Sequence, residues 1–190
     1  LTENYNTLHS TIVSRCQVYN MAALSRDDMI EYFKKHGFKL SEELELAIDN
    51  SSGIIGRALE ILKDENFKQR QKEYESILNK ILAGNRVEVF LLSDKLLNNK
   101  EEGASLLNFL LSFFRDILIL KDLKDNKYIM NKTVDLSLLE SYKNNMTEEK
   151  LFEIVDAVKQ TINSLEFNVS YKNSIDNLFL KILEVFNGKS

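Results

Sequence analysis

The sequence lacks proline and tryptophan altogether, and it has only six glycines and one cysteine in 190 residues. So few turn-forming residues disfavour a β-sandwich and are typical of helices joined by short turns. The lone Cys16 excludes an intrachain disulfide and most cysteine-based metal sites. The two histidines, His9 and His36, lie far apart in sequence, and neither belongs to a zinc-ligand spacing. We therefore expect no metal site.

Long hydrophobic runs are also missing, because no apolar stretch reaches the roughly 18 residues that cross a bilayer. The longest candidate, Leu106–Leu120, contains Asn108, Arg115 and Asp116. It is therefore predicted to be the central helix of a soluble bundle. The N-terminal residues lack the basic-then-apolar order of a secretory signal. These features predict a cytoplasmic protein with no membrane partner.

The chain has no excess of positive charge: 25 Lys and Arg face 29 Asp and Glu, for a net charge of −4. A free-standing DNA-binding domain usually carries a basic patch or stripe. Any contact with DNA is therefore expected to be local or shared with partners. The sequence also contains neither a G-x-x-x-x-G-K-[ST] phosphate loop nor a G-x-S-x-G nucleophile turn. These absences argue against nucleotide hydrolysis or serine-type catalysis by this chain alone.

Helical periodicity dominates what is present. Three short helices are predicted within residues 21–64, with Ser25 and Ser41 placed to cap the first two. The third begins at "SSGIIGRALEIL", residues 51–62. From residue 65 the predicted helices lengthen. The pattern indicates an all-α fold, in which a small three-helix domain precedes a helical bundle.

The first 20 residues differ from the rest. The stretch "TIVSRCQVY", Thr11–Tyr19, is β-branched and aromatic, and it predicts a short strand or loop. In an alternating segment Cys16 would turn inward as a small buried hydrophobe, and Arg15 would point outward. A reactive Cys16 would need a nearby base, and none can be inferred. Because one strand is not stable alone, this segment either docks on the helices or ends a domain that begins before Leu1.

Two arginines stand out as candidate binding residues. Arg15 follows the β-branched run, and a guanidinium forks onto phosphate oxygens. Arg57 lies in the first turn of a helix, where anions are favoured. Gly53 and Gly56 at that helix entry allow another backbone or a phosphate to come close. For each arginine the alternative is a solvated or locally paired side chain.

Three segments together resemble AAA+ clamp-loader subunits of bacterial DNA polymerase III. "TIVSRCQVY" resembles their T-I-x-S-R-C-Q segment, and "SSGIIGRALEIL" resembles the G-x-x-G-R-A-L sensor 2 helix of their lid domain. "LEFNVSYKNSIDNLFLKIL", Leu165–Leu183, is similar to the C-terminal N-x-N-x-x-L-x-x-D-x-L-L-L segment of the delta-prime class. The matches occur in the expected order. The chain departs from the pattern in two places: it lacks the usual proline before S-R-C, and Ser170 replaces the second asparagine.

The resemblance implies an architecture and a set of partners. Residues 1–20 would be the remnant of the AAA+ core, residues 21–64 the helical lid, and residues 65–190 the collar oligomerisation domain. The phosphate loop would lie upstream, so the chain would be the C-terminal part of a longer protein. The implied partners are the gamma/tau and delta subunits through the collar, and the sliding clamp and primed DNA through the complex. ATP-Mg would be bound by neighbouring subunits, with no cofactor in this chain.

The resemblance also implies roles for the candidate residues. Arg15 would be an arginine finger that acts in trans on ATP held by a neighbouring subunit, and Ser14 and Cys16 would shape its loop. Arg57 would be the nucleotide-sensing sensor 2 arginine, with Gly53 and Gly56 supporting the helix entry. The chain itself would catalyse nothing and would be an accessory subunit of a DNA-directed DNA polymerase. Two alternatives stay open: a gamma/tau-type clamp-loader ATPase subunit, and an unrelated helical protein-interaction module.

Overall fold

The regular structure of the described chain is entirely helical, which confirms the all-α prediction. The computed structural model describes residues 8–19, 21–84, 86–96, 100–123, 128–131, 134–166 and 170–188. The helices are α1 (Ser10–Val13), α2 (Arg26–Lys35), α3 (Glu42–Asn50), α4 (Ile55–Lys63), α5 (Phe67–Ala83), α6 (Arg86–Leu96), α7 (Lys100–Asp122), α8 (Leu136–Asn145), α9 (Glu148–Glu166) and α10 (Tyr171–Asn187). Residues 1–7 of the predicted core remnant and 167–169 of the C-terminal motif lie outside the described residues.

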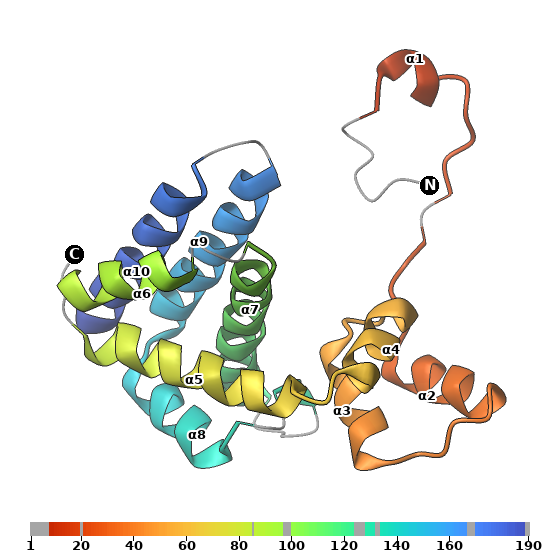
Figure 1. Ribbon diagram of the computed structural model, residues 1–190, viewed down its shortest axis with the longest axis horizontal. Helices are drawn as coiled ribbons and strands as arrows, with labels where there is room; N and C mark the ends of the chain where they lie inside the picture. Colours follow the sequence, from red (N-terminus) through yellow and green to blue (C-terminus); the bar gives the residue numbers. More distant parts are fainter. Residues whose placement is uncertain are drawn as a thin grey trace.

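The helices form two groups, each around its own hydrophobic core (Figure 1). Helices α2–α4 enclose a small core, and α5–α10 enclose a large one. The small core consists of Met29, Phe33, Leu44, Ala47, Ile48 and Ala58. The two cores do not merge, so each group owes its packing to its own apolar residues.

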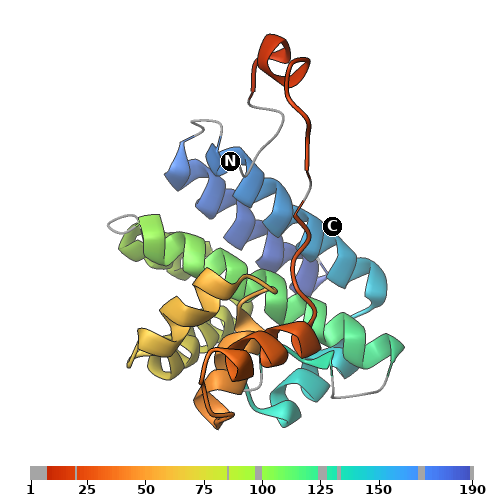
Figure 2. The same cartoon turned by 90° about the vertical axis from the view of Figure 1, so that its right-hand side faces the viewer.

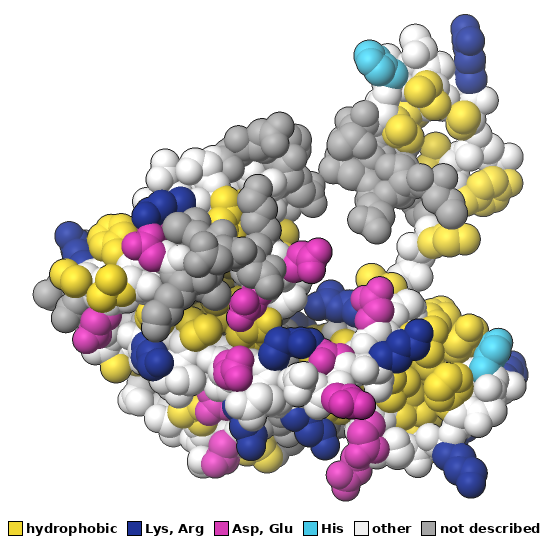
Figure 3. All heavy atoms as spheres, viewed as in Figure 1, with side chains coloured by type: hydrophobic (Ala, Val, Ile, Leu, Met, Phe, Trp, Pro, Cys, Tyr) yellow, Lys and Arg dark blue, Asp and Glu magenta, His cyan; other side chains and the backbone are white. Residues whose placement is uncertain are grey.

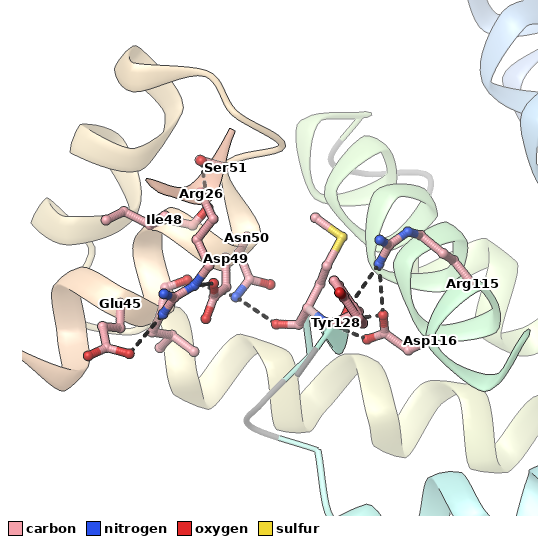
Figure 4. Close-up of polar contacts among 11 residues, drawn as sticks. Arg26, Glu45, Ile48, Asp49, Asn50, Ser51, Arg115, Asp116 and Tyr128 are labelled. Carbon is pink, nitrogen blue, oxygen red and sulfur yellow. Dashed lines mark hydrogen bonds and ion pairs between the residues drawn. The ribbon is translucent and has the colours of Figure 1, made fainter. Parts of the chain in front are cut away.

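The three-helix group begins its helices where the sequence predicts. Ser25 accepts a hydrogen bond from the Asp28 N–H at 3.2 Å, and Ser41 accepts one from the Leu44 N–H at 3.3 Å. Such caps typically contribute about 1 kcal/mol each. Across the group, Arg26 of α2 turns toward Glu45 and Asp49 of α3, at 2.9 Å and 2.8 Å (Figure 4). These contacts fix α2 against α3.

Helix α7 is the central helix of the six-helix bundle. It packs against α8 and α9, while α10 packs against α5, α6 and α9. The side chains of Leu110, Phe113, Phe114 and Ile117 are fully buried. No uninterrupted apolar run spans a bilayer, yet the stretch 101–122, charged residues included, is long and apolar enough on average to cross one, and 56% of its most apolar part is buried inside the bundle. That burial is typical of the core helix of a soluble protein.

A buried carboxylate on α7 organises the segment that faces the three-helix group. Asp116 is fully buried, and it accepts hydrogen bonds from the backbone N–H of Met130 at 3.0 Å and of Asn131 at 2.8 Å. The Asn131 amide also donates to it at 2.8 Å. Arg115 donates to it at 3.1 Å (Figure 4). Burial raises the pKa of the Asp116 carboxyl, and the hydrogen bonds from Asn131 and Met130 oppose that shift. The carboxylate thereby holds residues 130 and 131 against α7.

The held segment in turn contacts the three-helix group. Asn50, the last residue of α3, donates through Nδ2 to the Met130 carbonyl at 3.4 Å and to the Leu46 carbonyl at 2.9 Å. The two helix groups are also joined directly through the short turn between α4 and α5, where Arg70 pairs with Asp64. Polar contacts of this kind connect the groups, and no shared apolar core does so in the described chain.

The sequence predicts strand and loop for Thr11–Tyr19; the strand part is wrong in the described chain, whereas residues 14–19 are turn and loop. Residues 10–13 form the short helix α1, followed by a turn and an extended stretch that leads down to α2 (Figure 2). The turn is closed by local bonds, such as the Ser14 N–H to the Ser10 carbonyl at 2.9 Å. A strand requires an edge to pair with, and no described segment offers one. Figure 3 shows this N-terminal segment standing apart, with apolar side chains on its surface.

We expect Asp116→Ala to destabilise the bundle by roughly 2–5 kcal/mol. The change leaves the buried N–H groups of Met130 and Asn131 without their acceptor, and each such loss costs about 1–3 kcal/mol. Denaturant unfolding measures the difference. The control is Asp94→Ala, which removes a half-exposed carboxylate paired with Lys172 on the surface and is expected to change little. Equal stability of the two variants would contradict the central place given to Asp116.

Candidate functional site

Arg15 lies in an exposed turn that directly follows α1. Its backbone N–H donates to the Ile12 carbonyl at 3.1 Å, and the hydroxyl of Ser14 donates to the Thr11 carbonyl at 3.3 Å. These bonds fold the turn that presents the Arg15 side chain. Arg15 is exposed, as predicted. The guanidinium is therefore held out from the chain on a short, internally bonded loop.

Cys16 is exposed, which makes the prediction of a buried packing residue wrong. That prediction rested on strand alternation, which places neighbouring side chains on opposite faces of a sheet. The local structure is a turn instead, and its segment packs on neither helix group (Figure 1). Cys16 contributes to the site through its backbone, whose N–H donates to the Val13 carbonyl at 3.3 Å.

Arg57 lies in the first turn of α4, at a helix start that no side chain caps. The N-cap residue is Ile54, which offers no oxygen to the first-turn N–H groups. Uncapped N–H groups and the positive end of the helix dipole favour an anion at such a position. A Cβ built on Gly56 would meet no atom within 4 Å. The start of α4 therefore has open space beside Gly56 and no side-chain cap.

Gly53 has a different role from Gly56, because its backbone lies close to Ala23 and Leu24 in the segment before α2. Its φ of +77° is one that L side chains rarely adopt. A Cβ there would lie 2.8 Å from the Leu24 nitrogen and 2.9 Å from the Ala23 Cβ. The Leu24 N–H also donates to the Gly53 carbonyl at 3.0 Å. Gly53 thus fastens the segment that enters α2 to the turn that precedes α4.

Arg15 and Arg57 differ from the other four arginines in their ion pairing. The sequence has six arginines, and four of them form ion pairs inside the described chain. Those pairs are Arg26 with Glu45 and Asp49, Arg70 with Asp64, Arg86 with Glu184, and Arg115 with Asp116. Arg15 and Arg57 form no hydrogen bond or ion pair through their side chains with any described residue. They are the two arginines that the motifs single out.

The structure does not bring Arg15 and Arg57 together. Arg15 follows α1, and Arg57 is part of α4, and both views show these elements well separated (Figures 1 and 2). Arg57 lines a cleft of about 310 Å³ formed by α4, α5, α7 and Met130. Each arginine is therefore available to a different molecule or a different part of one molecule.

The sequence did not predict the buried polar contacts that hold residues 130 and 131 beside the cleft. Asp116 and its partner Asn131 join elements that are 15 positions apart. A signal was available, since Asp116 is a charged residue inside a strongly apolar run, and a buried charge needs partners. Its partners could not be named, because they come from a loop with no periodic pattern. Among the described residues, no three His, Cys, Asp or Glu side chains converge to hold a metal ion.

No protein-family model matches this chain, and no curated protein sequence matches it either. Its function has to be argued from its own residues, their exposure and their pairing.

The two glycines at the start of α4 should respond to alanine in opposite ways. Gly53→Ala is expected to destabilise the three-helix group by about 1–3 kcal/mol, because it combines a left-handed φ with a collision against Leu24. Gly56→Ala is expected to stabilise it by roughly 0.5–1 kcal/mol, because glycine in a helix is unfavourable relative to alanine. Thermal unfolding of both variants measures the signs. A loss of equal size in both would show that Gly56 is also packed closely.

Proposed function

We propose that the chain is the C-terminal part of a delta-prime-type subunit of a bacterial clamp loader. In that role it assembles with other loader subunits, and the complex places a sliding clamp on primed DNA in the cytoplasm. The observation that carries the proposal is the pairing of the arginines. Four arginines are paired internally, whereas the two that resemble the arginine finger and the sensor 2 residue have no side-chain partner among the described residues.

The exposure of the Arg15 turn supports a role in trans. An arginine finger stabilises charge that develops on a transferring phosphoryl group held by another subunit. Such a residue has to be presented away from its own chain, without a carboxylate partner that would compete for it. Arg15 meets both conditions, since it is exposed and unpaired among the described residues.

The start of α4 supports the second role. Arg57 combines a guanidinium that has no partner among the described residues with an uncapped helix start and with open space beside Gly56. These features favour an anion. Gly53 links this helix to the segment that leads back to Arg15 through the Leu24–Gly53 bond. In the proposed role, residues 21–64 act as the lid, and residues 65–190 form the collar.

Helix α6 offers an exposed apolar stripe that suits assembly of the collar. Val87, Phe90 and Leu91 are spaced at i, i+3 and i+4, so they share one face of the helix. Their exposed fractions are 68%, 42% and 59%. The opposite side of α6 buries Val89 and Ser93 against the bundle. Figure 3 shows apolar side chains on the surface on this side of the bundle. We assign the stripe to contact with a neighbouring collar.

Arg15→Ala, made in the full-length protein and assembled with its partners, tests the finger role. The complex is expected to assemble normally and to lose ATP hydrolysis at the single site that Arg15 serves, by about 10³-fold or more. DNA-stimulated hydrolysis and the solution mass of the complex are the measurements. Arg15→Lys should also lose most of this activity, because an ammonium lacks the planar fork. Lys39→Ala, which removes an exposed cation from the three-helix group, is the control. Unchanged hydrolysis by an assembled Arg15→Ala complex would sink the assignment.

The double variant Phe90→Glu, Leu91→Glu tests the α6 stripe. It should weaken assembly with partner subunits by at least roughly 30-fold, because charges would replace two apolar anchors of an interface. Both side chains are partly exposed, so the unfolding free energy of the isolated chain should change little. Phe152→Glu on α9 is the matched control, since Phe152 is also exposed. Analytical ultracentrifugation of mixtures gives the affinities, and wild-type assembly by the double variant would exclude α6 from the interface.

A further inference from the structure

The cleft between the three-helix group and the bundle has the size and position of a ligand site. Its volume is about 310 Å³. Small-molecule and peptide-end sites typically span about 300–1,000 Å³ and occur preferentially where two domains meet. Here α4 forms one wall, and α5 and α7 form the other, with Met130 beside them. The Asp116 carboxylate accepts a hydrogen bond from the Met130 N–H and so keeps Met130 beside the cleft.

Ion pairing within the described chain leaves one guanidinium in the cleft uncommitted. Three arginines and two acids, Glu60 and Asp64, are among its lining residues. Arg70 is paired with Asp64, and Arg115 is paired with Asp116. Arg57 is the lining arginine whose guanidinium has no partner among the described residues. A polyphosphate would meet the Glu60 carboxylate and find one uncommitted cation, whereas one carboxylate suits Arg57 in a forked geometry.

A buried amide in the cleft wall calls for a hydrogen-bond donor. Gln71 is 7% exposed and lines the cleft, and its Oε1 has no hydrogen-bond partner among the described residues. A buried acceptor without a partner costs about 1–3 kcal/mol. The terminal torsion of glutamine is broad, so the amide can turn its carbonyl toward the cleft. A ligand that donates an N–H would remove this cost.

Part of the remaining lining is apolar and would accept a hydrocarbon side chain, and the rest is polar, with Asn50, Ser52, Ser105, Asn108 and Ser112. Ile61 and Phe67 line the cleft near the turn between α4 and α5, and Phe109 lines it from α7. Tyr74 adds a buried ring, and burial raises the pKa of its hydroxyl. One carboxylate, one adjacent N–H and one apolar side chain together describe the C-terminal residue of a polypeptide.

We propose that this cleft binds the C-terminal residue of a partner polypeptide that ends in an apolar amino acid. The terminal carboxylate pairs with Arg57, its main-chain N–H donates to the Gln71 carbonyl, and its side chain packs against Ile61 and Phe67. Capture of a chain terminus by a few polar groups is a recurring mode of peptide recognition. The proposal holds whether or not the chain is part of a clamp loader, because it depends only on the cleft.

The test uses the 190-residue chain and two short acetylated peptides that end in Ala-Leu. One peptide carries a free carboxylate and the other a C-terminal amide. In nitrogen-15 NMR titrations the free acid is expected to shift the Gln71 side-chain amide signal and to saturate. The amidated peptide should bind at least about tenfold more weakly, because it lacks the charge-assisted bond. Arg57→Gln should lose about as much, and Arg86→Gln, which changes an arginine outside the cleft, should bind like wild type.

Four results would overturn the proposal. Equal binding of the acid and the amide would remove the role of the carboxylate. Full binding by a folded Arg57→Gln variant would remove the role of Arg57, and the amide comparison in the wild-type chain stays decisive if that variant fails to fold. ADP that shifts the Gln71 signal and competes with the peptide in an Arg57-dependent way would assign the cleft to a nucleotide instead. Absence of any shift at millimolar peptide would likewise exclude the site.

Discussion

A buried carboxylate, that of Asp116, is the constraint on which the joint between the two helix groups depends. Burying a charge is costly unless it is fully hydrogen-bonded. Asp116 meets this requirement by collecting two backbone N–H groups, the Asn131 amide and Arg115. Burial still raises the pKa of its carboxyl, so the hydrogen bonds do not fully replace water. In return, these hydrogen bonds hold residues 130 and 131 against α7.

The consequences of that order extend into the three-helix group. The Met130 carbonyl accepts from Asn50 at the end of α3, and the turn after α3 leads to Gly53, which holds Leu24. A chain of specific polar contacts therefore runs from the centre of the bundle to the entry of α2. Because the hydrophobic cores stay separate, the angle between the groups depends on a small number of contacts rather than on a continuous apolar interface. Domains joined by few contacts are expected to move relative to each other. Arg57 lines the cleft between the two helix groups, so such a movement would change its surroundings.

Local signals in the sequence were enough to predict most of the helices, but not the contacts that join them. Caps at Ser25 and Ser41 and the apolar run of α7 are short-range patterns, and the structure confirms them. The errors at Thr11–Tyr19 share a physical cause. Alternation assigns faces only once a strand has a partner, and without one the segment closes local hydrogen bonds and leaves Cys16 exposed. The partners of Asp116 were unpredictable for the opposite reason, since they are non-local and come from an aperiodic loop.

Arg15 and Asp116 show two ways in which this chain accommodates a charged side chain. Arg15 is exposed to solvent, whereas Asp116 is buried among hydrogen-bond donors. Asp116 shows that this chain can surround a charge with partners when the fold needs it, and the ion pairs of four arginines show the same at its surface. Leaving Arg15 and Arg57 without partners is therefore informative, because acidic residues outnumber basic ones in the sequence. Partners of the right sign are abundant, yet none is placed beside these two side chains in the described chain. An unpaired guanidinium gives up little stability at the surface and retains its full capacity for an external anion. The two arginines without partners in the described chain are thus the ones available to an external anion, whereas the four paired ones hold parts of the fold together.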